Sequence, residues 1–192
     1  MSDRAMTGPA GGGFVARAQL LDATAVRRAL RRMAHEIVER NADVPVLVVL
    51  GLQHGGVALG EFLARELTEL SPTTVASGSI DVAFHRDDLD RRPLRGPQTT
   101  SIPVDLTDAV VVLVDDVLFT GRTIRAALNA LAEWGRPRAI QLAVLVDRGH
   151  RELPIRADYV GKNVPTSRRE AVVATPEGVW IGERHGDEEA GE

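Results

Sequence analysis

Apolar side chains along the chain follow two patterns, continuous runs and helical spacing. Continuous runs, typical of strands buried on both faces, cover residues 44–50, 109–114 and 139–146. Apolar positions at the helical period of about 3.6 residues cover residues 22–40, 57–70 and 121–134. Strand, turn and helix repeated in this order predict an α/β fold built on a parallel sheet with right-handed crossovers.

The helix predicted over residues 22–40 has recognisable signals at both ends. Asp22 is placed to cap its first turn, and Leu21 and Val26 are placed to pack across that cap. Asn41 is placed to end it. The apolar face consists of Val26, Leu30, Met33, Ile37 and Val38.

Other parts of the chain are less regular. Residues 75–85 are strand-like, and Gly78 is expected to form a bulge there. Residues 86–103 combine prolines and arginines with few apolar side chains, which predicts a long exposed loop, and such loops often cover a site. Short strands and turns are expected beyond residue 147.

Composition limits the possible functions. The absence of cysteine excludes disulfides, thiolate zinc sites and cysteine nucleophiles. No apolar run approaches the ~20 residues of a membrane span, so we expect a cytoplasmic protein with no membrane partner. We expect residues 1–19 to be a disordered leader, residues 20–182 a single domain and residues 183–192 an acidic flexible tail.

The formal net charge of −4 argues against a nucleic-acid binder when the chain is taken as a whole. Arginines nevertheless cluster in residues 27–32 and 148–156, so a local basic face is compatible with an acidic total. Taken alone, such a run is more typical of a solvated helix face than of an RNA site.

The most informative segment spans the end of the second apolar run and the start of the helix that follows it. It consists of Val111, Val112, Leu113, Val114, Asp115, Asp116, Val117, Leu118, Phe119, Thr120, Gly121, Arg122 and Thr123. A buried strand thus delivers two carboxylates to its carboxyl end, where ligands of parallel sheets bind. The segment predicts a ligand site at this edge of the sheet.

The residue types in this segment suit a sugar phosphate. A helix start offers free amide groups and a partial positive charge to a phosphate, Gly121 permits close approach, and Thr120 and Thr123 add hydroxyl donors. Two carboxylates repel a phosphate but accept hydrogen bonds from a ribose diol. The alternative is that Asp115 and Asp116 merely end a strand and Thr120 merely caps a helix. No Walker-type or dinucleotide-binding glycine motif is present.

At these residues the sequence resembles the signature by which type I phosphoribosyltransferases bind 5-phosphoribosyl-1-pyrophosphate (PRPP). Three further segments resemble the PyrR family, namely residues 27–41, 84–89 and 146–167. The resemblance implies a Rossmann-like, parallel-sheet fold with a small hood over the base. That family comprises regulators of pyrimidine-operon mRNA that are also uracil phosphoribosyltransferases.

The resemblance also implies a reaction, in which uracil and PRPP give UMP and pyrophosphate. Mg²⁺ would enter bound to PRPP, without a metal site formed by the protein alone. Asp115 and Asp116 would hold the ribose and be the catalytic carboxylates, and Arg86 would cover the pyrophosphate. Phe119 stands where hypoxanthine-type enzymes usually carry an acid, which disfavours a purine.

One position departs from the family pattern. The loop expected to hold pyrophosphate usually reads Thr-Arg-Gly, whereas here it is Gln53, His54 and Gly55. An imidazole that is mostly neutral at pH 7 replaces a permanent guanidinium there. Two interpretations stay open, weak transferase turnover or a loop in which His54 is simply tolerated.

The family resemblance further implies an RNA-binding face. The residues concerned are Arg31, Arg32, His35, Arg40, Arg151, Arg156 and Lys162. UMP or UTP in the nucleotide site would favour binding to the pyr mRNA leader, and a homodimer or larger homo-oligomer is expected. For His150, a place beside the base and a place on the RNA face both stay open.

Three functions therefore compete. The first is a regulator of transcription or translation with uracil phosphoribosyltransferase activity. The second is an RNA-binding nucleotide sensor that Gln53 and His54 have left with little or no activity. The third is a salvage phosphoribosyltransferase without an RNA role.

Overall fold

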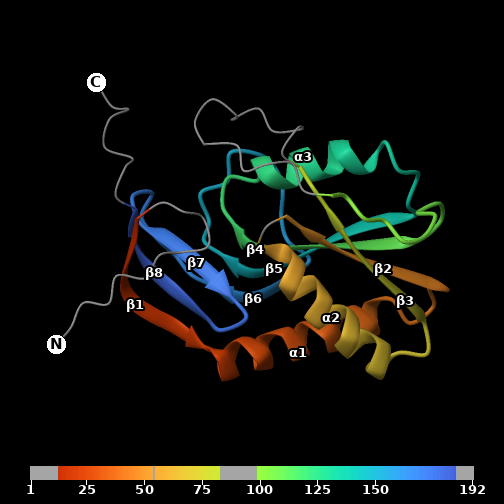
Figure 1. The fold of residues 1–192 in the computed structure, drawn as a ribbon, viewed down its shortest axis with the longest axis horizontal. Helices are drawn as coiled ribbons and strands as arrows, with labels where there is room; N and C mark the ends of the chain where they lie inside the picture. Colours follow the sequence, from red (N-terminus) through yellow and green to blue (C-terminus); the bar gives the residue numbers. More distant parts are fainter. Residues whose placement is uncertain (1–12, 54, 83–98, 185–192) are drawn as a thin grey trace.

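The computed structural model describes residues 13–53, 55–82 and 99–184, which form two separate sheets (Figure 1). The larger sheet has five parallel strands in the order β3-β2-β4-β5-β6, and the smaller one has three antiparallel strands in the order β1-β8-β7. In chain order the elements are β1 (Phe14–Asp22), α1 (Ala23–Arg40), β2 (Val46–Leu52), α2 (Gly56–Leu70), β3 (Thr74–Ile80), β4 (Val110–Leu118), α3 (Arg122–Leu131), β5 (Ala139–Asp147), β6 (Tyr159–Asn163), β7 (Ala171–Thr175) and β8 (Gly178–Arg184). The predicted parallel α/β sheet is confirmed.

Helices cover both faces of the larger sheet. Figure 1 shows α1 and α2 along one face and α3 on the other. Alternate residues of β4 serve the two faces, since Val112 packs in the cluster that includes α1 and α2 and Val111 packs in the cluster that includes α3. Burial on both faces explains why β2, β4 and β5 are continuous apolar runs.

The first helix has the ends that its sequence predicts. The side chain of Asp22 accepts a hydrogen bond from the amide of Ala25 at 2.7 Å, and Asn41 forms the C-cap. Two other predicted boundaries shift. The strand β4 continues through the acid pair to Leu118, and α3 ends at Leu131 rather than near Trp134, which is 47% exposed.

The small sheet corrects two predicted boundaries. The strand β1 begins at Phe14, so residues 14–19 are not part of a disordered leader, and β8 includes Glu183 and Arg184, which were assigned to the tail. The strand β1 pairs along β8 from near the other end of the chain, and Phe14 is 3% exposed. Its register shifts between Ala16 and Ala18 and between Gln19 and Leu21, which hides the alternation that marks a strand in a sequence. The rest of both predicted segments lies outside the described residues, except for Gly13.

Gly78 does not form the expected bulge. The pairing of β2 with β3 runs without a shift from Val46 opposite Thr74 to Leu52 opposite Ile80. A side chain at Gly78 would instead meet the carbonyl oxygen of Ser101 at 2.2 Å, so the glycine is needed for a close backbone approach.

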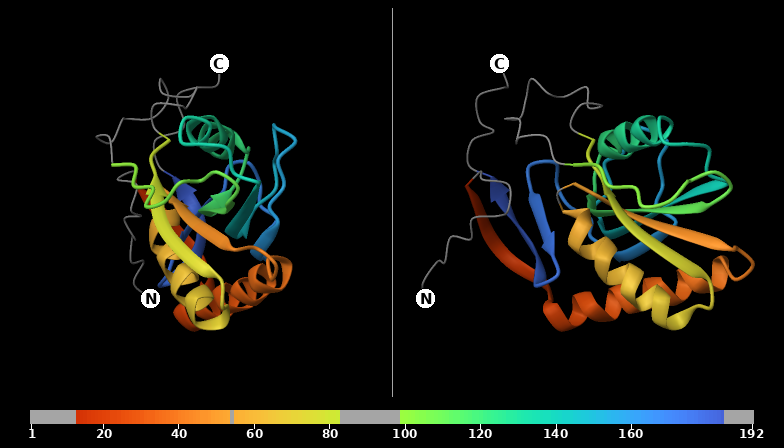
Figure 2. Two further views of the ribbon diagram at one scale, coloured as in Figure 1. Left: turned by 90° about the vertical axis from the view of Figure 1, so that its right-hand side faces the viewer. Right: turned by 45° about the vertical axis from the view of Figure 1, so that its right-hand side comes forward.

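The small sheet connects directly to α1, because β1 ends at Asp22 and the helix begins at Ala23. Figure 2 shows the small sheet standing beside the larger one, at the end of α1 where the helix begins. Among the described residues, no helix is both long and apolar enough to cross a membrane.

Candidate active site

Two adjacent carboxylates lie near the carboxyl end of β4. Asp115 is 7% exposed, and its Oδ1 accepts a hydrogen bond from the amide of Asp116 at 3.0 Å. Oδ1 of Asp116 accepts from the amide of Val117 at 2.8 Å. The backbone therefore fixes both carboxyl groups before any ligand arrives.

The surroundings of Asp116 oppose its ionisation. Burial raises the pKa of this carboxyl above its ordinary value of 3.8. The side-chain interaction with Asp115, hydrogen bonds from the backbone and the positive charge of Arg184 act in the opposite direction without cancelling the effect of burial. The carboxylate is thus a strong acceptor that the folded protein holds at a cost.

The turn after β2 packs directly on this acid pair. A methyl group at Gly55 would lie 2.2 Å from Oδ2 of Asp116, and one at Gly56 would lie 2.0 Å from the carbonyl oxygen of Val114. The strands β2 and β4 are parallel neighbours, so their carboxyl ends meet at the same edge of the sheet. Gln53 and Gly55 are described on this turn, whereas His54 lies outside the described residues.

Residues 120–123 form the start of α3. Gly121 is the N-cap and has a φ of 94°, a left-handed conformation that favours glycine. The guanidinium of Arg122 is directed to Glu152, with Nε 2.9 Å from Oε2. The backbone and hydroxyl groups of this turn, rather than the Arg122 side chain, are thus the groups best placed for an anion at the helix start.

Arg151 stabilises the loop between β4 and α3 through hydrogen bonds to its backbone. Its Nη1 donates to the carbonyl oxygen of Phe119 at 2.7 Å, its Nε donates to that of Ile155 at 3.0 Å, and it is paired with Asp147. The side chain is 21% exposed. The structure therefore gives Arg151 a bracing contact with the loop, and its predicted role in RNA binding stays a prediction.

Phe119 is enclosed by two side chains from the turn after β5. The guanidinium carbon of Arg148 lies 4.0 Å from the centre of the Phe119 ring, and the ring of His150 meets it edge-on, with centres 5.7 Å apart. His150 has a φ of 62°, which is unusual for a residue other than glycine. Its Nε2 donates to the carbonyl oxygen of Thr166 at 2.6 Å. His150 therefore lies beside this loop, with Phe119.

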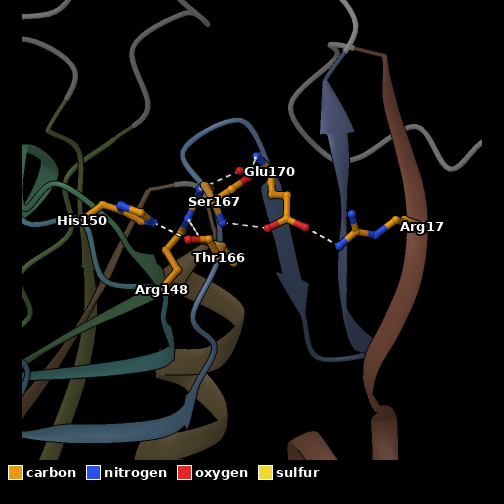
Figure 3. A network of polar contacts seen from close by, with 6 residues as sticks. All are labelled: Arg17, Arg148, His150, Thr166, Ser167 and Glu170. Carbon is orange, nitrogen blue, oxygen red and sulfur yellow. Dashed lines mark hydrogen bonds and ion pairs between the residues drawn. The ribbon is translucent and has the colours of Figure 1, made fainter.

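A network of polar contacts extends from this turn to the small sheet (Figure 3). Arg148 donates from Nε to the hydroxyl of Thr166 at 3.0 Å and from Nη2 to the carbonyl oxygens of Ser167 and Glu170 at 3.0 and 2.6 Å. The carboxylate of Glu170 accepts from the amide of Ser167 at 2.7 Å and pairs with Arg17 on β1. Sequence reasoning missed Arg148 and Glu170, because their partners lie elsewhere in the chain.

The predicted RNA-binding residues come together only in part. Arg32 on α1 and Lys162 on β6 line one surface depression of about 350 Å³, together with Arg28. Leu21, Ala25 and Ala29 contribute apolar surface to it. Arg32 also donates to the carbonyl oxygens of Val160 and Gly161, both at 2.9 Å, and so joins α1 to the edge strand β6.

The remaining predicted members are more scattered. Arg31 is directed to Glu66 on α2, with an N–O distance of 3.3 Å, and Arg40 pairs with Asp158 at 2.6 Å. The hydrogen bond that Arg40 donates to Asp158 is the main reason why the pKa of Arg40 is raised. His35 and Arg156 are exposed. Arg86 and most of the predicted lid lie outside the described residues.

Metal ligation at this edge of the sheet would rest on the two carboxylates of the acid pair. Within the described ranges, no three histidine, aspartate or glutamate side chains gather as a set that would hold a metal ion. Asp115 and Asp116 supply hard oxygen ligands, which suit Mg²⁺ when other oxygens complete its coordination.

Comparison with known proteins decides the family. The model of the phosphoribosyl transferase domain matches residues 16–177. The bifunctional protein PyrR of Trichormus variabilis is 56% identical over 154 residues, which cover 80% of this chain and 86% of that protein. The chain belongs to the PyrR family. The PyrR proteins of Deinococcus radiodurans and Mycolicibacterium paratuberculosis are both 54% identical over 159 residues, covering 81% and 80% of this chain and 86% and 84% of those proteins.

Solved structures confirm the type I phosphoribosyltransferase fold. A hypoxanthine phosphoribosyltransferase from Staphylococcus aureus has a TM-score of 0.65 at 16% identity and covers 89% of this chain and 94% of its own. The Trypanosoma cruzi enzyme, solved in complex with the product IMP, has a TM-score of 0.64 at 16% identity, with 88% and 91% covered. At this identity the likeness concerns the fold, and the PyrR family carries the closer sequence likeness.

Proposed function

We propose that this PyrR-family chain regulates pyrimidine biosynthesis by binding pyr mRNA in response to uridine nucleotides, and that it converts uracil and PRPP to UMP and pyrophosphate. The observation that carries the proposal is the meeting of the Gly55 turn with the acid pair beside the start of α3. This arrangement places diol acceptors, an anion-binding helix start and a second backbone turn at one edge of the sheet. The ligand that needs all three is a ribose carrying phosphate at both ends.

Each part of the site has one task in the transfer. Asp115 and Asp116 accept hydrogen bonds from the two ribose hydroxyls, and residues 120–123 bind the 5′-phosphate. The bond from the anomeric carbon to pyrophosphate breaks, and its electron pair leaves with pyrophosphate. The uracil nitrogen N1 bonds to that carbon and loses its proton to solvent, and the sugar carries positive charge in between. No protein nucleophile is needed, so positioning and charge neutralisation supply the catalysis.

Mg²⁺ is proposed to enter with PRPP. When bound, it neutralises charge on the leaving pyrophosphate. Asp115 and Asp116 are the described residues whose carboxylate oxygens fit such an ion, and Arg86 is proposed to cover the pyrophosphate from the loop. The remaining contacts to PRPP are the ribose and phosphate hydrogen bonds given above for Asp115, Asp116 and residues 120–123.

The transferase half is tested by the initial rate of UMP formation from uracil and PRPP with Mg²⁺. We expect formation that depends on both substrates and saturates with each. A rate equal to that without protein would eliminate the enzymatic half and favour the second candidate, a nucleotide sensor that binds RNA. The observation favouring that candidate is the pair Gln53 and His54 in the pyrophosphate turn.

Restoring a guanidinium in that turn is expected to strengthen PRPP binding. One charge-assisted hydrogen bond contributes about 1.5–3 kcal/mol, so His54→Arg should lower the KM for PRPP roughly 10- to 100-fold. The KM for uracil should change little. Asn129→Arg adds the same charge on an exposed part of α3 and serves as the control. Equal KM values in His54→Arg and the unmodified protein would mean that residue 54 does not contact pyrophosphate.

RNA binding is proposed for the depression between α1 and β6. Its cationic rim suits phosphates, and its apolar surface suits an unpaired base. The double variant Arg28→Glu, Lys162→Glu is expected to weaken leader-RNA binding at least about 10-fold at ~0.1 M salt, and to reduce the slope of log K against log salt by about 2.

The matched control for the RNA experiment is Arg136→Glu, Arg138→Glu, which makes the same change of charge on the exposed turn before β5. The control should bind RNA with a smaller loss, and both variants should bind UMP normally. Equal losses in the two double variants would show a general charge effect and remove the depression from the proposal. An unmodified protein that does not bind leader RNA would favour the salvage enzyme instead.

The proposed setting follows from the proposed function. Substrates and mRNA leader are encountered together in the cytoplasm. A homodimer or larger homo-oligomer is proposed as the working form, and sedimentation of the full chain would measure it.

A further inference from the structure

Next to Phe119 lies a buried positive charge, that of Arg148, which the proposed function does not use. Arg148 is 7% exposed, and burial lowers the pKa of its guanidinium. Its three hydrogen bonds go to a hydroxyl and two backbone carbonyl oxygens, all uncharged. The nearby carboxylate of Asp147 is paired with Arg151, and that of Glu170 is paired with Arg17.

One nitrogen of this guanidinium, Nη1, has N–H donors that are not used within the described part of the protein. Nε and Nη2 make the three bonds to residues 166–170, while Nη1 makes no hydrogen bond to the residues that the structure describes. Within the same part of the chain, no fully buried side-chain nitrogen or oxygen lacks a partner. Nη1 of Arg148 therefore reaches space that a ligand or water can enter.

The position of this free end relates it to the nucleotide. Phe119 lies between the acid pair and the helix start, on the loop proposed to bind ribose 5-phosphate. The Arg148 guanidinium lies over the Phe119 ring at 4.0 Å, and the same side chain anchors the turn at residues 166–170 (Figure 3). The base is the one part of the nucleotide that carries neither ribose hydroxyls nor phosphate. The Phe119 ring is the part of the loop that suits such a flat, uncharged group.

We infer that Arg148 determines which pyrimidine is accepted, by fixing Phe119 against the turn at residues 166–170 and by donating from Nη1 to the C4 carbonyl oxygen of the base. A guanidinium can only donate hydrogen bonds. Facing position 4 of the ring, it therefore suits uracil, which carries a carbonyl oxygen there, and opposes cytosine, which carries an amino group there that also donates. Sites built on such a hydrogen bond discriminate strongly, because a mismatched ligand leaves a buried polar group without a partner.

The inference rests on the proposed function and is tested by calorimetric binding of UMP and CMP to the full chain. The unmodified protein is expected to bind UMP at least about 100-fold more tightly than CMP. In Arg148→Met this ratio should fall at least 10-fold, mainly through weaker UMP binding, while PRPP affinity changes less than twofold. Arg148→Lys, which keeps the charge and is the milder change, should give an intermediate ratio. Arg169→Met, an exposed arginine on the same turn, is the control and should keep the full ratio.

The outcomes separate this inference from the proposed function. If the unmodified protein binds neither nucleotide, the proposed function fails. If it prefers UMP and both Arg148 variants keep that preference, the assignment of Arg148 is overturned. The assignment is also overturned if UMP, CMP and PRPP all weaken by the same factor, because that pattern indicates a structural role only. Should Arg148→Met fail to fold, the ratio measured in Arg148→Lys decides.

Discussion

Asp116→Asn is expected to slow phosphoribosyl transfer strongly and at the same time to raise the melting temperature. The carboxylate is the proposed acceptor for a ribose hydroxyl, so its loss should lower kcat/KM at least about 100-fold. Burial raises the pKa of Asp116, which means that the folded protein is less stable with this group ionised. A neutral side chain of the same shape removes that cost, and we therefore expect the melting temperature to rise.

The dependence on pH makes this prediction more specific. A raised pKa in the folded state contributes stability that is fully present below the ordinary carboxyl pKa of 3.8 and is lost as pH rises through the higher folded value. Asp116→Asn has no carboxyl group to ionise at this position and therefore does not lose this stability. The difference in melting temperature between Asp116→Asn and the unmodified protein should be absent near pH 4 and grow toward pH 7. Differential scanning calorimetry across this range measures it.

Asp105→Asn is a control for which the opposite change in melting temperature is expected. Hydrogen bonds from the amide and hydroxyl of Thr107 lower the pKa of Asp105, whose charged form is therefore favoured by folding. This variant should keep full activity, and its melting temperature should fall relative to the unmodified protein as pH rises above the lowered pKa. Activity of Asp116→Asn within a few-fold of the unmodified protein would contradict the role given to the acid pair.

The second large effect is expected from Gly55→Ala. Gly55 has φ −72° and ψ −30°, which alanine adopts without strain, so the backbone conformation gives no reason for a loss. The added methyl group would lie 2.2 Å from Oδ2 and 2.3 Å from Cγ of Asp116. Either the turn or the carboxylate must move, and a displacement of about 1 Å in such a site can cost roughly 100-fold in rate.

Steady-state kinetics with uracil and PRPP measure this effect, and Gly135→Ala is the comparison. Gly135 lies in the turn before β5 with a φ of 138°, so alanine there is strained but its nearest neighbour is 3.5 Å away. We expect Gly135→Ala to lower stability and keep activity, and Gly55→Ala to lower activity. If Gly55→Ala retained normal kcat/KM, the turn and the acid pair would not act as one site.

The strands predicted best are those buried on both faces. Residues 46–52, 110–118 and 139–147 have a nearly continuous apolar character because helices cover both sides of their sheet. The strand β1 was missed because its bulges break the alternation and its partner, β8, is encoded near the other end of the chain. Local sequence carries no sign of such a partner.

In the candidate site, too, features encoded by consecutive residues were predictable and features that depend on distant residues were not. The acid pair and the glycine at the helix start were predictable, since strand, carboxylates and helix start are consecutive in sequence. Arg148 was not, because its bonding partners follow 18 to 22 residues later and its sequence neighbourhood looks like a basic surface cluster. The direction of Arg122 toward Glu152, 30 residues away, likewise depends on tertiary structure alone.

A crystal structure of the full chain grown with UMP tests the central claim most directly. We expect the ribose hydroxyls within hydrogen-bond distance of Asp115 and Asp116, and the 5′-phosphate on the amides and hydroxyls of residues 120–123. A nucleotide bound elsewhere, with that loop unchanged and without ligand, would contradict the account.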